Sequence, residues 1–246
     1  MKKFQWQILL GVILVALSAI LYSLHYFIFR DAYHIFIYLL GDIAFLPIEV
    51  LLVTLIIDRV LSAREKQAML EKLNMVIGAF FSEVGLELLH SFASFDLNAQ
   101  NIKKELSGID RWTEKDFIRV SAMITKFKYS INSHEGDIEK LKTFLSMKRN
   151  FLLRLLENPN LLEHEKFTEL LWAVFHLTEE LDYRKDLNSS PESDFNHLSG
   201  DIKRAYLLLI SEWISHIKHL KKNYPYLYSL EARMNPFDDD ASPVVS

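Results

Sequence analysis

Two long apolar stretches occupy the first quarter of the chain, and helical periodicity dominates the remainder. Residues 4–29 are almost uninterrupted apolar sequence, and residues 35–57 form a second stretch with a few small or polar residues and one proline. A helix needs about 20 apolar residues to cross a hydrocarbon core of about 30 Å. The pattern therefore predicts a two-helix transmembrane hairpin over residues 1–58.

The distribution of positive charge predicts how this hairpin is oriented. Two lysines precede the first span, Arg59 and Arg64 follow the second, and Arg30 between the spans is offset by Asp31. Positive charge close to membrane ends stays on the cytoplasmic side. We therefore expect a multi-pass protein of the cell membrane, with the lipid bilayer as a partner and both termini in the cytoplasm.

A cleaved signal peptide is the alternative interpretation of the first span. The two N-terminal lysines resemble a charged n-region, and Ala16-Leu17-Ser18 resembles a cleavage site. Apolar sequence nevertheless continues for about ten residues past that point, which is longer than signal peptides usually allow. Even if cleavage occurred, residues 35–57 would anchor the same domain on the same side.

The fold class predicted for the whole chain is all-α, with residues 59–235 forming a cytoplasmic bundle of about five helices. No proline or glycine interrupts the sequence from Asp58 to Ile77, so the first helix of this domain should continue directly from the second span. Its apolar positions are three and four residues apart: Leu70, Leu73, Ile77, Phe80 and Val84. We interpret them as one face of an amphipathic helix packed on its own domain, with a short coiled-coil seam as the alternative.

The remaining elements follow from caps, prolines and polar stretches. A loose connection is expected over residues 93–112, and Thr113 with Asp116 three residues later predicts the N-cap of a helix to about residue 130. Asn158-Pro159 should end the next helix. Helices are expected over residues 136–156, 161–183 and 198–222, a loop over 185–196, a short helical turn before Asn235-Pro236, and a disordered acidic tail over 236–246.

Charge and cysteine content narrow the choice of partners. Three of the 28 basic residues and four of the 32 acidic residues lie before Arg59, so the predicted domain carries a net charge of about −3. It has no dense basic stripe, which argues against nucleic acid as a partner. The chain has no cysteine, which agrees with a cytoplasmic domain without disulfides.

The second span contains two carboxylates and a proline. Asp42 and Glu49 are seven residues apart and share a helix face, about 10 Å from each other along the axis, with Pro47 between them. Ionisable groups at membrane depth are costly and usually face protein or water. We interpret them as a polar contact between helices or part of a proton or cation path. If the span begins near Ile43 instead, Asp42 lies at the outer interface, whereas Glu49 remains within the membrane.

Several histidines and glutamates have the spacing of metal ligands. Glu-x-x-His pairs resemble those of di-iron bundles, which place such groups in the bundle core. A helical wheel instead places them away from the apolar stripe of each helix, so we expect a solvated face, no metal and no other cofactor. The residues concerned are Glu83, Glu87, His90, His176, Glu180, Glu212, His216 and His219.

Small residues at Gly78, Ser82 and Gly85 form a stripe along one helix face. Such a stripe allows another helix to approach closely. We expect packing within the domain, with self-association as the alternative.

The sequence contains no familiar catalytic motif. Walker loops, Gly-x-Ser-x-Gly and dinucleotide fingerprints are absent, and the seven glycines are scattered. The sequence thus predicts a non-enzymatic membrane protein whose helical domain serves as an interaction, scaffold or sensor module, binding another protein or itself. An oligomeric channel or transport component using Glu49 and Asp42 is the alternative, and a metal-dependent helical enzyme ranks third.

Overall fold

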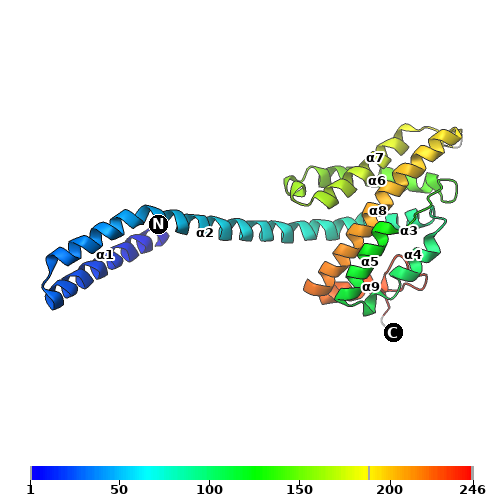
Figure 1. Ribbon diagram of the computed structural model, residues 1–246. Coiled ribbons are helices and arrows are strands. Elements are labelled where there is room, and N and C mark those ends of the chain that lie inside the picture. The colour runs from blue at the N-terminus through cyan, green and yellow to red at the C-terminus, as the bar shows by residue number, and fades with distance from the viewer. Residues whose placement is uncertain (1, 188, 245–246) are drawn as a thin grey trace. The chain divides into compact units, whose positions relative to one another are not determined.

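The computed structural model describes residues 2–187 and 189–244, and it is helical throughout most of its length (Figure 1). The chain divides into two compact units, Met1–Glu65 and Lys66–Ser246, which we call the N-terminal unit and the C-terminal unit. Within the described residues, β pairing is limited to one bridge between Asp96 and Ile131. The all-α fold class is thus confirmed.

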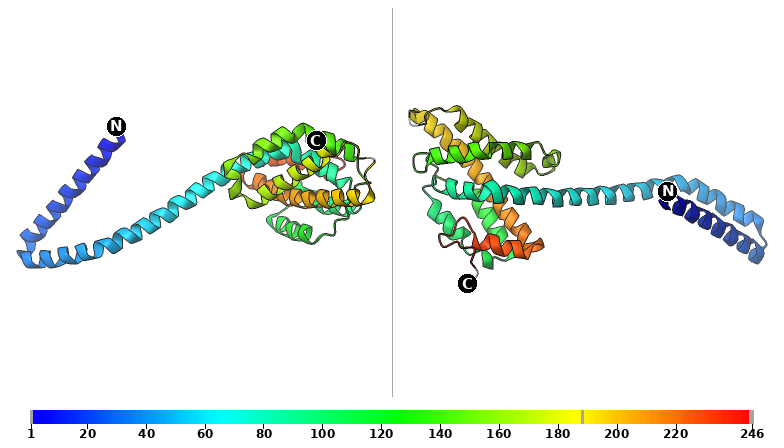
Figure 2. Two further views of the ribbon diagram at one scale, coloured as in Figure 1. Left: turned by 90° about the horizontal axis from the view of Figure 1, so that it is seen from above. Right: turned by 180° about the vertical axis from the view of Figure 1, so that it is seen from behind.

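The N-terminal unit contains α1 (Lys2–Phe29) and the first half of α2 (Ala32–Phe80). Arg30 joins them in the left-handed conformation, at a φ of 53°, and its N–H donates to the Tyr26 carbonyl at 2.8 Å. Asp31 Oδ1 accepts from the N–H of His34 at 3.1 Å and so satisfies a free donor at the start of α2. The two helices open apart from this turn (Figure 2).

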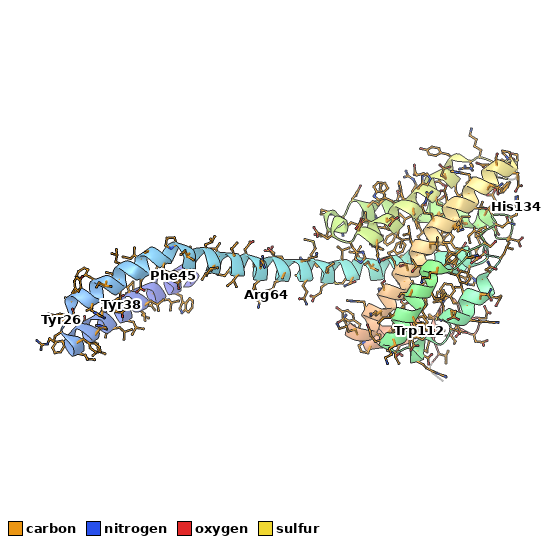
Figure 3. All side chains as sticks on the ribbon, viewed as in Figure 1. Tyr26, Tyr38, Phe45, Arg64, Trp112 and His134 are labelled. Carbon is orange, nitrogen blue, oxygen red and sulfur yellow. The ribbon has the colours of Figure 1, made fainter. Side chains whose placement is uncertain are left out.

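The apolar side chains of the N-terminal unit lie on its surface. Tyr26, Tyr38 and Phe45 project outward from the helices (Figure 3), and Phe27 and Leu40 are 74% and 70% exposed. Both helices are long and apolar enough to cross a membrane, with mean hydropathies of 2.3 and 2.2 over their most apolar windows. None of those windows is buried by the rest of the chain.

Helix α2 is continuous over 49 residues, with Pro47 inside it. The predicted absence of a break between Asp58 and Ile77 is confirmed. Within the C-terminal unit, Leu73, Ile77 and Phe80 on this helix are buried. The apolar seam therefore packs on its own domain, as expected.

The C-terminal unit is built around α8 (Glu192–Asn223), which is 32 residues long. It packs against α7 (Glu165–Tyr183), α5 (Glu114–Lys126), α9 (Pro225–Arg233) and α3 (Leu86–Ala93), while α6 (Ile138–Leu156) packs on α7 (Figure 1). Trp213 and Tyr206 of α8 have no exposed surface. The remaining elements are α4 (Ala99–Leu106), a π-helical turn at Phe81–Gly85, and 3₁₀ turns at Ile109–Arg111 and Pro159–Glu163.

The loose connection expected over residues 93–112 was wrong, because it contains α4 and a 3₁₀ turn. Ile102 and Leu106, one helical turn apart, are fully buried. Gly108 then takes a φ of 67° and separates the two elements. Two apolar positions are too few to reveal a helical period in the sequence, so the short helix depends on the tertiary contacts that bury them.

The other helix boundaries differ from the expected ones by a few residues. Helix α6 begins after Asp137, whose side chain accepts from the N–H of Lys140 at 2.9 Å. A 3₁₀ turn that starts at Pro159 precedes α7. Helix α8 includes residues assigned to the loop over 185–196, because only Pro191 is extended and the helix starts at the next residue, Glu192. Residue 188 of that loop lies outside the described residues.

Packed structure extends past the expected domain end at residue 235. Phe237 is 2% exposed and contacts the ring of Trp213 at 5.3 Å between centroids. The Asn235 side chain donates to the Leu106 carbonyl at 2.8 Å. Beyond it, the Ser242 N–H donates to the Arg233 carbonyl at 3.0 Å. Residues 245–246 of the expected acidic tail lie outside the described residues.

The predicted N-cap of α5 is present. Asp116 Oδ2 accepts from the backbone N–H of Thr113 at 2.8 Å and from its hydroxyl at 2.7 Å. These hydrogen bonds hold the pKa of Asp116 below its usual range. The helix ends at Lys126 rather than near residue 130, because Phe127 is extended.

Replacing Thr113 by alanine should lower the free energy of unfolding by about 1 kcal/mol, because the cap loses its hydroxyl. Urea denaturation of the variant and the wild type measures this loss. Thr125→Ala on the same helix is the control, since Thr125 is exposed and bonds only to the preceding turn at Ser121. Equal losses from both substitutions would contradict a stabilising cap.

Candidate functional site

A groove in the C-terminal unit is lined by α2, the π-helical turn, α8 and α9. We call it the α2–α8 groove, and its volume is about 450 Å³. Its lining residues are Glu71, Asn74, Met75, Gly78, Ser82, His216, His219, Leu220, Tyr224, Leu227, Leu230 and Glu231. Small-molecule sites in proteins fall in this size range and combine apolar walls with a few polar groups.

The π-helical turn allows two consecutive aromatic side chains to be buried. Phe80 and Phe81 are both fully buried, although neighbouring residues of a regular α-helix point about 100° apart. At Gly85 a Cβ atom would lie 2.5 Å from Cδ1 of Phe81, so only glycine fits that position. At Gly78 a Cβ would lie 3.6 Å from Cε1 of His216. Within the stripe of small residues, Gly78 thus packs against α8 of the same unit, which is packing within the domain. Ser82 is exposed and lines the groove.

His216 is the most unusual residue of the groove. Its side chain is 5% exposed, and its ring stacks on Phe81 at 5.1 Å between centroids and 14° between planes. Nδ1 is buried and has no hydrogen-bond partner among the described residues. Burial lowers the pKa of His216 to about 4, with a smaller contribution from His219. The imidazole is therefore neutral at pH 7.

Glu231 of α9 supplies a second polar group to the groove. Its Oε2 atom is buried and has no hydrogen-bond partner among the described residues. Burial raises the pKa of this carboxyl. Buried polar atoms in folded proteins are nearly always paired, so two such atoms in one groove are uncommon.

The part of the groove around His219 is more polar. Burial lowers the pKa of His219, whereas the charge of Glu71 acts in the opposite direction and Lys222 reinforces the decrease. The His219 ring also contacts the amide of Asn223, with 3.1 Å between Nδ1 and Nδ2. This part therefore already has polar partners within the chain.

A separate ion-pair cluster joins α7 to α8. His176 Nε2 and His197 Nε2 lie 3.5 Å and 3.3 Å from Oδ2 of Asp201, which is 4% exposed. Both histidines also approach Glu180, at 3.8 Å and 3.7 Å. Among the described residues, no group of three or more His, Asp or Glu side chains has the arrangement of a metal site.

Arginines neutralise the carboxylates of this cluster. Arg184 donates from Nε and Nη2 to Asp194 at 2.8 Å and 2.7 Å, and from Nη1 to Glu180 at 2.6 Å. These hydrogen bonds hold the pKa values of Asp194 and Glu180 below their usual range. Arg204 Nη1 donates to Asp201 Oδ1 at 3.2 Å. The arrangement is that of a structural clasp between two helices.

The other predicted site residues occupy different environments. Glu83, Glu87 and His90 are exposed, as the helical wheel predicts, and the two glutamates face Lys148 and Lys140 of α6 at 2.9 Å and 3.8 Å. His176 is also exposed. Asp42 and Glu49 on α2 are exposed and have no hydrogen bond or ion pair within the described part of the chain, and Pro47 lies between them within the helix.

The solvated face predicted for Glu212 and His216 was wrong. They are 3% and 5% exposed, and burial raises the pKa of Glu212, whose Oε2 lies 3.9 Å from His164 Nε2. A wheel with one apolar stripe describes a helix that packs on one side. Helix α8 packs on several sides at once, so its polar positions are buried as well.

The groove itself was not predicted from the sequence. Glu231 gave no signal, because α9 was expected only as a short turn. Two signals touched it: the stripe at Gly78 and Ser82, and the candidate metal ligands His216 and His219, all of which line the groove. A stripe of small residues indicates a close helix but not a cavity beside it.

Lowering the pH from about 6.5 to about 4 should destabilise the C-terminal unit through His216, by about 3 kcal/mol at most. Because the folded-state pKa is lowered, the unfolded chain binds the proton more strongly, and stability falls as the pH falls through this window. Urea denaturation at several pH values should give a shallower decline for His216→Gln.

The exposed His90 provides the control, since His90→Gln should keep the wild-type pH dependence. An unchanged slope for His216→Gln would show that this imidazole is not the group responsible.

The chain matches two helical domain families over most of its length. The match over residues 2–61 is described as "MJ1433, N-terminal helical domain", and that over residues 69–233 as "Uncharacterized protein MJ1433, C-terminal helical domain". The uncharacterized protein MJ1433 of Methanocaldococcus jannaschii is 47% identical over 239 residues, which cover 97% of this chain and 96% of that protein. No solved structure matches the chain. The gap between the two matched domains includes Glu65, where the N-terminal unit ends, and the chain belongs to the MJ1433 family.

Proposed function

We propose that the protein is an integral membrane protein in which α1 and the first half of α2 anchor a non-catalytic binding domain, the C-terminal unit. The observation that carries this proposal is the apolar surface of the N-terminal unit. Apart from Ile35 and Leu39, which are half-buried, its large apolar residues from Trp6 to Leu61 are 40–76% exposed. Soluble monomers rarely expose apolar patches larger than a few hundred Å², so this surface requires a cover. A bilayer would cover the apolar parts of both helices, because each is long enough to span its hydrocarbon core.

Charge supports an orientation with the C-terminal unit in the cytoplasm. Lys2 and Lys3 precede the first span, and Arg59 and Arg64 follow the second span. Both groups therefore lie at the open end of the hairpin, opposite the turn. The turn between the spans has Arg30 beside Asp31, so it lacks an excess of positive charge. By the positive-inside rule, the turn lies outside and both termini lie inside.

A binding role for the C-terminal unit rests on two observations. The sequence has no cysteine and no familiar catalytic motif. The unit has its own hydrophobic core and carries a groove large enough for a small molecule. Such a domain, held at the membrane by a continuous helix, is suited to sensing or scaffolding.

An oligomeric channel or transport component is the second candidate function. Asp42 and Glu49 are carboxylates within the apolar part of α2, and neither has a partner in the described residues. Such groups are costly in a bilayer and usually face protein or water. One hairpin cannot enclose a path, so this function requires several copies of the chain.

Reporter fusions at the C-terminus and at Asp31 should report opposite sides of the membrane, with the C-terminus in the cytoplasm. Alkaline carbonate should leave the full chain in the membrane fraction. A chain lacking residues 1–58 is the control and should become soluble, because it lacks the apolar surface. Complete extraction of the full chain by carbonate would refute the anchor.

The substitution Glu49→Leu distinguishes a hairpin that only anchors the protein from one in which Glu49 also joins helices of different copies. If Glu49 holds helices together, Glu49→Leu should weaken self-association by about 1 kcal/mol, the usual size of an interhelical hydrogen bond in a membrane. Sedimentation of the protein in mild detergent measures this change. Thr54→Val is the matched control, since the Thr54 hydroxyl bonds to the Val50 carbonyl of its own helix at 2.7 Å.

If the wild-type protein is monomeric, the proposed roles of Glu49 in assembly and in conduction are both wrong, because each requires several copies of the chain. If the oligomer forms, Glu49→Gln tested in liposomes distinguishes the two, because a conducting path should lose or change its proton or cation flux while assembly persists.

A further inference from the structure

We propose that the α2–α8 groove binds an organic cation with an apolar body, such as an arylalkyl or alkyl amine. This site extends the proposed binding role by naming a ligand class. It does not depend on membrane insertion, because every lining residue belongs to the C-terminal unit. The failure of one proposal therefore leaves the other intact.

The shape and walls of the groove fit a small apolar molecule. Met75 of α2, Leu220 of α8, and Leu227 and Leu230 of α9 line it together. Met75, Leu227 and Leu230 are 67%, 40% and 44% exposed, so the chain itself does not cover these walls. Burial of an apolar ligand body against them is favourable because it removes that surface from water.

Two unpartnered polar atoms indicate that a ligand with hydrogen-bond donors completes the site. Nδ1 of His216 and Oε2 of Glu231 are buried and have no hydrogen-bond partner among the residues that the structure describes, and both residues line the groove. His216 is also more than nine-tenths buried. An ammonium group has three donors and can serve a carboxylate oxygen and a neutral imidazole nitrogen together.

Charge complementarity selects a cation among the possible ligands. Among the described residues that line the groove, two are carboxylates, Glu71 and Glu231, and none is a lysine or arginine. Lys222 lies outside this lining and acts on the pKa of His219, at the more polar part of the groove. An anionic ligand would meet the Glu231 carboxylate in a partly desolvated environment, whereas a cation would stabilise its ionised form.

The π-helical turn provides an independent sign of function at the same place. Such turns are rare and are frequently found at functional sites. Here the turn places Phe81 under the His216 ring and Ser82 at the groove. The π-helical turn thus holds the imidazole in position, while Nδ1 has no partner in the described part of the chain.

The test compares three probes of the same size and different charge: 2-phenylethylamine, 2-phenylethanol and phenylacetate. Calorimetric titration uses the full chain in mild detergent, with detergent alone as the blank. The amine should bind about tenfold or more tightly than the alcohol, because it adds a charge-assisted hydrogen bond. Phenylacetate should bind most weakly of the three.

Glu231→Gln keeps the size of the side chain and removes its charge, so it should weaken amine binding about tenfold and leave alcohol binding unchanged. Glu83→Gln is the matched control, because Glu83 is exposed and outside the groove lining, and it should bind as the wild type does. If Glu231→Gln fails to fold, Glu71→Gln at the exposed edge should still weaken amine binding, by about twofold to threefold.

Three results would overturn the proposal. They are no binding of the amine, equal binding of all three probes, and equal amine binding by Glu231→Gln and the wild type. Circular dichroism of each variant establishes that a loss of binding is not a loss of fold.

Discussion

The burial of α8 on several sides is the interaction on which the C-terminal unit depends. Trp213 and Tyr206 on this helix are fully enclosed, and α3, α5, α7 and α9 all pack against it. Removing so much apolar surface from water is the largest favourable contribution to the stability of the unit. Because the helix is packed on several sides, its polar side chains at Asp201, Glu212 and His216 are buried too.

Each of these buried polar groups is accommodated differently. Asp201 is compensated by Arg204 and two histidines, and Glu212 lies near His164. His216 avoids the cost of a buried charge by remaining neutral, but its Nδ1 has no described partner. The same packing that stabilises the unit thus leaves one group available to a ligand, in a groove between α8 and α9.

Helix α2 belongs to both units and serves both in different ways. Its first half exposes apolar side chains that need a bilayer or another protein to cover them. Its last turns bury Leu73, Ile77 and Phe80 in the core and contribute Gly78 to the groove. One uninterrupted helix therefore carries both the proposed anchor and part of the proposed binding site.

The sequence by itself determined the features that rest on local composition and period. The two apolar helices, the unbroken path from Asp58 to Ile77, the cap at Thr113 and the exposed position of Glu83 and Glu87 all follow from residues close together in the chain. Only the tertiary structure decided the existence of α4, the burial of Glu212 and His216, and the packing of Phe237 on Trp213. These features depend on how many neighbours surround a helix, and a helical wheel considers one helix at a time. The groove likewise required tertiary structure, because residues from α2, α8 and α9 meet there only after the chain has folded.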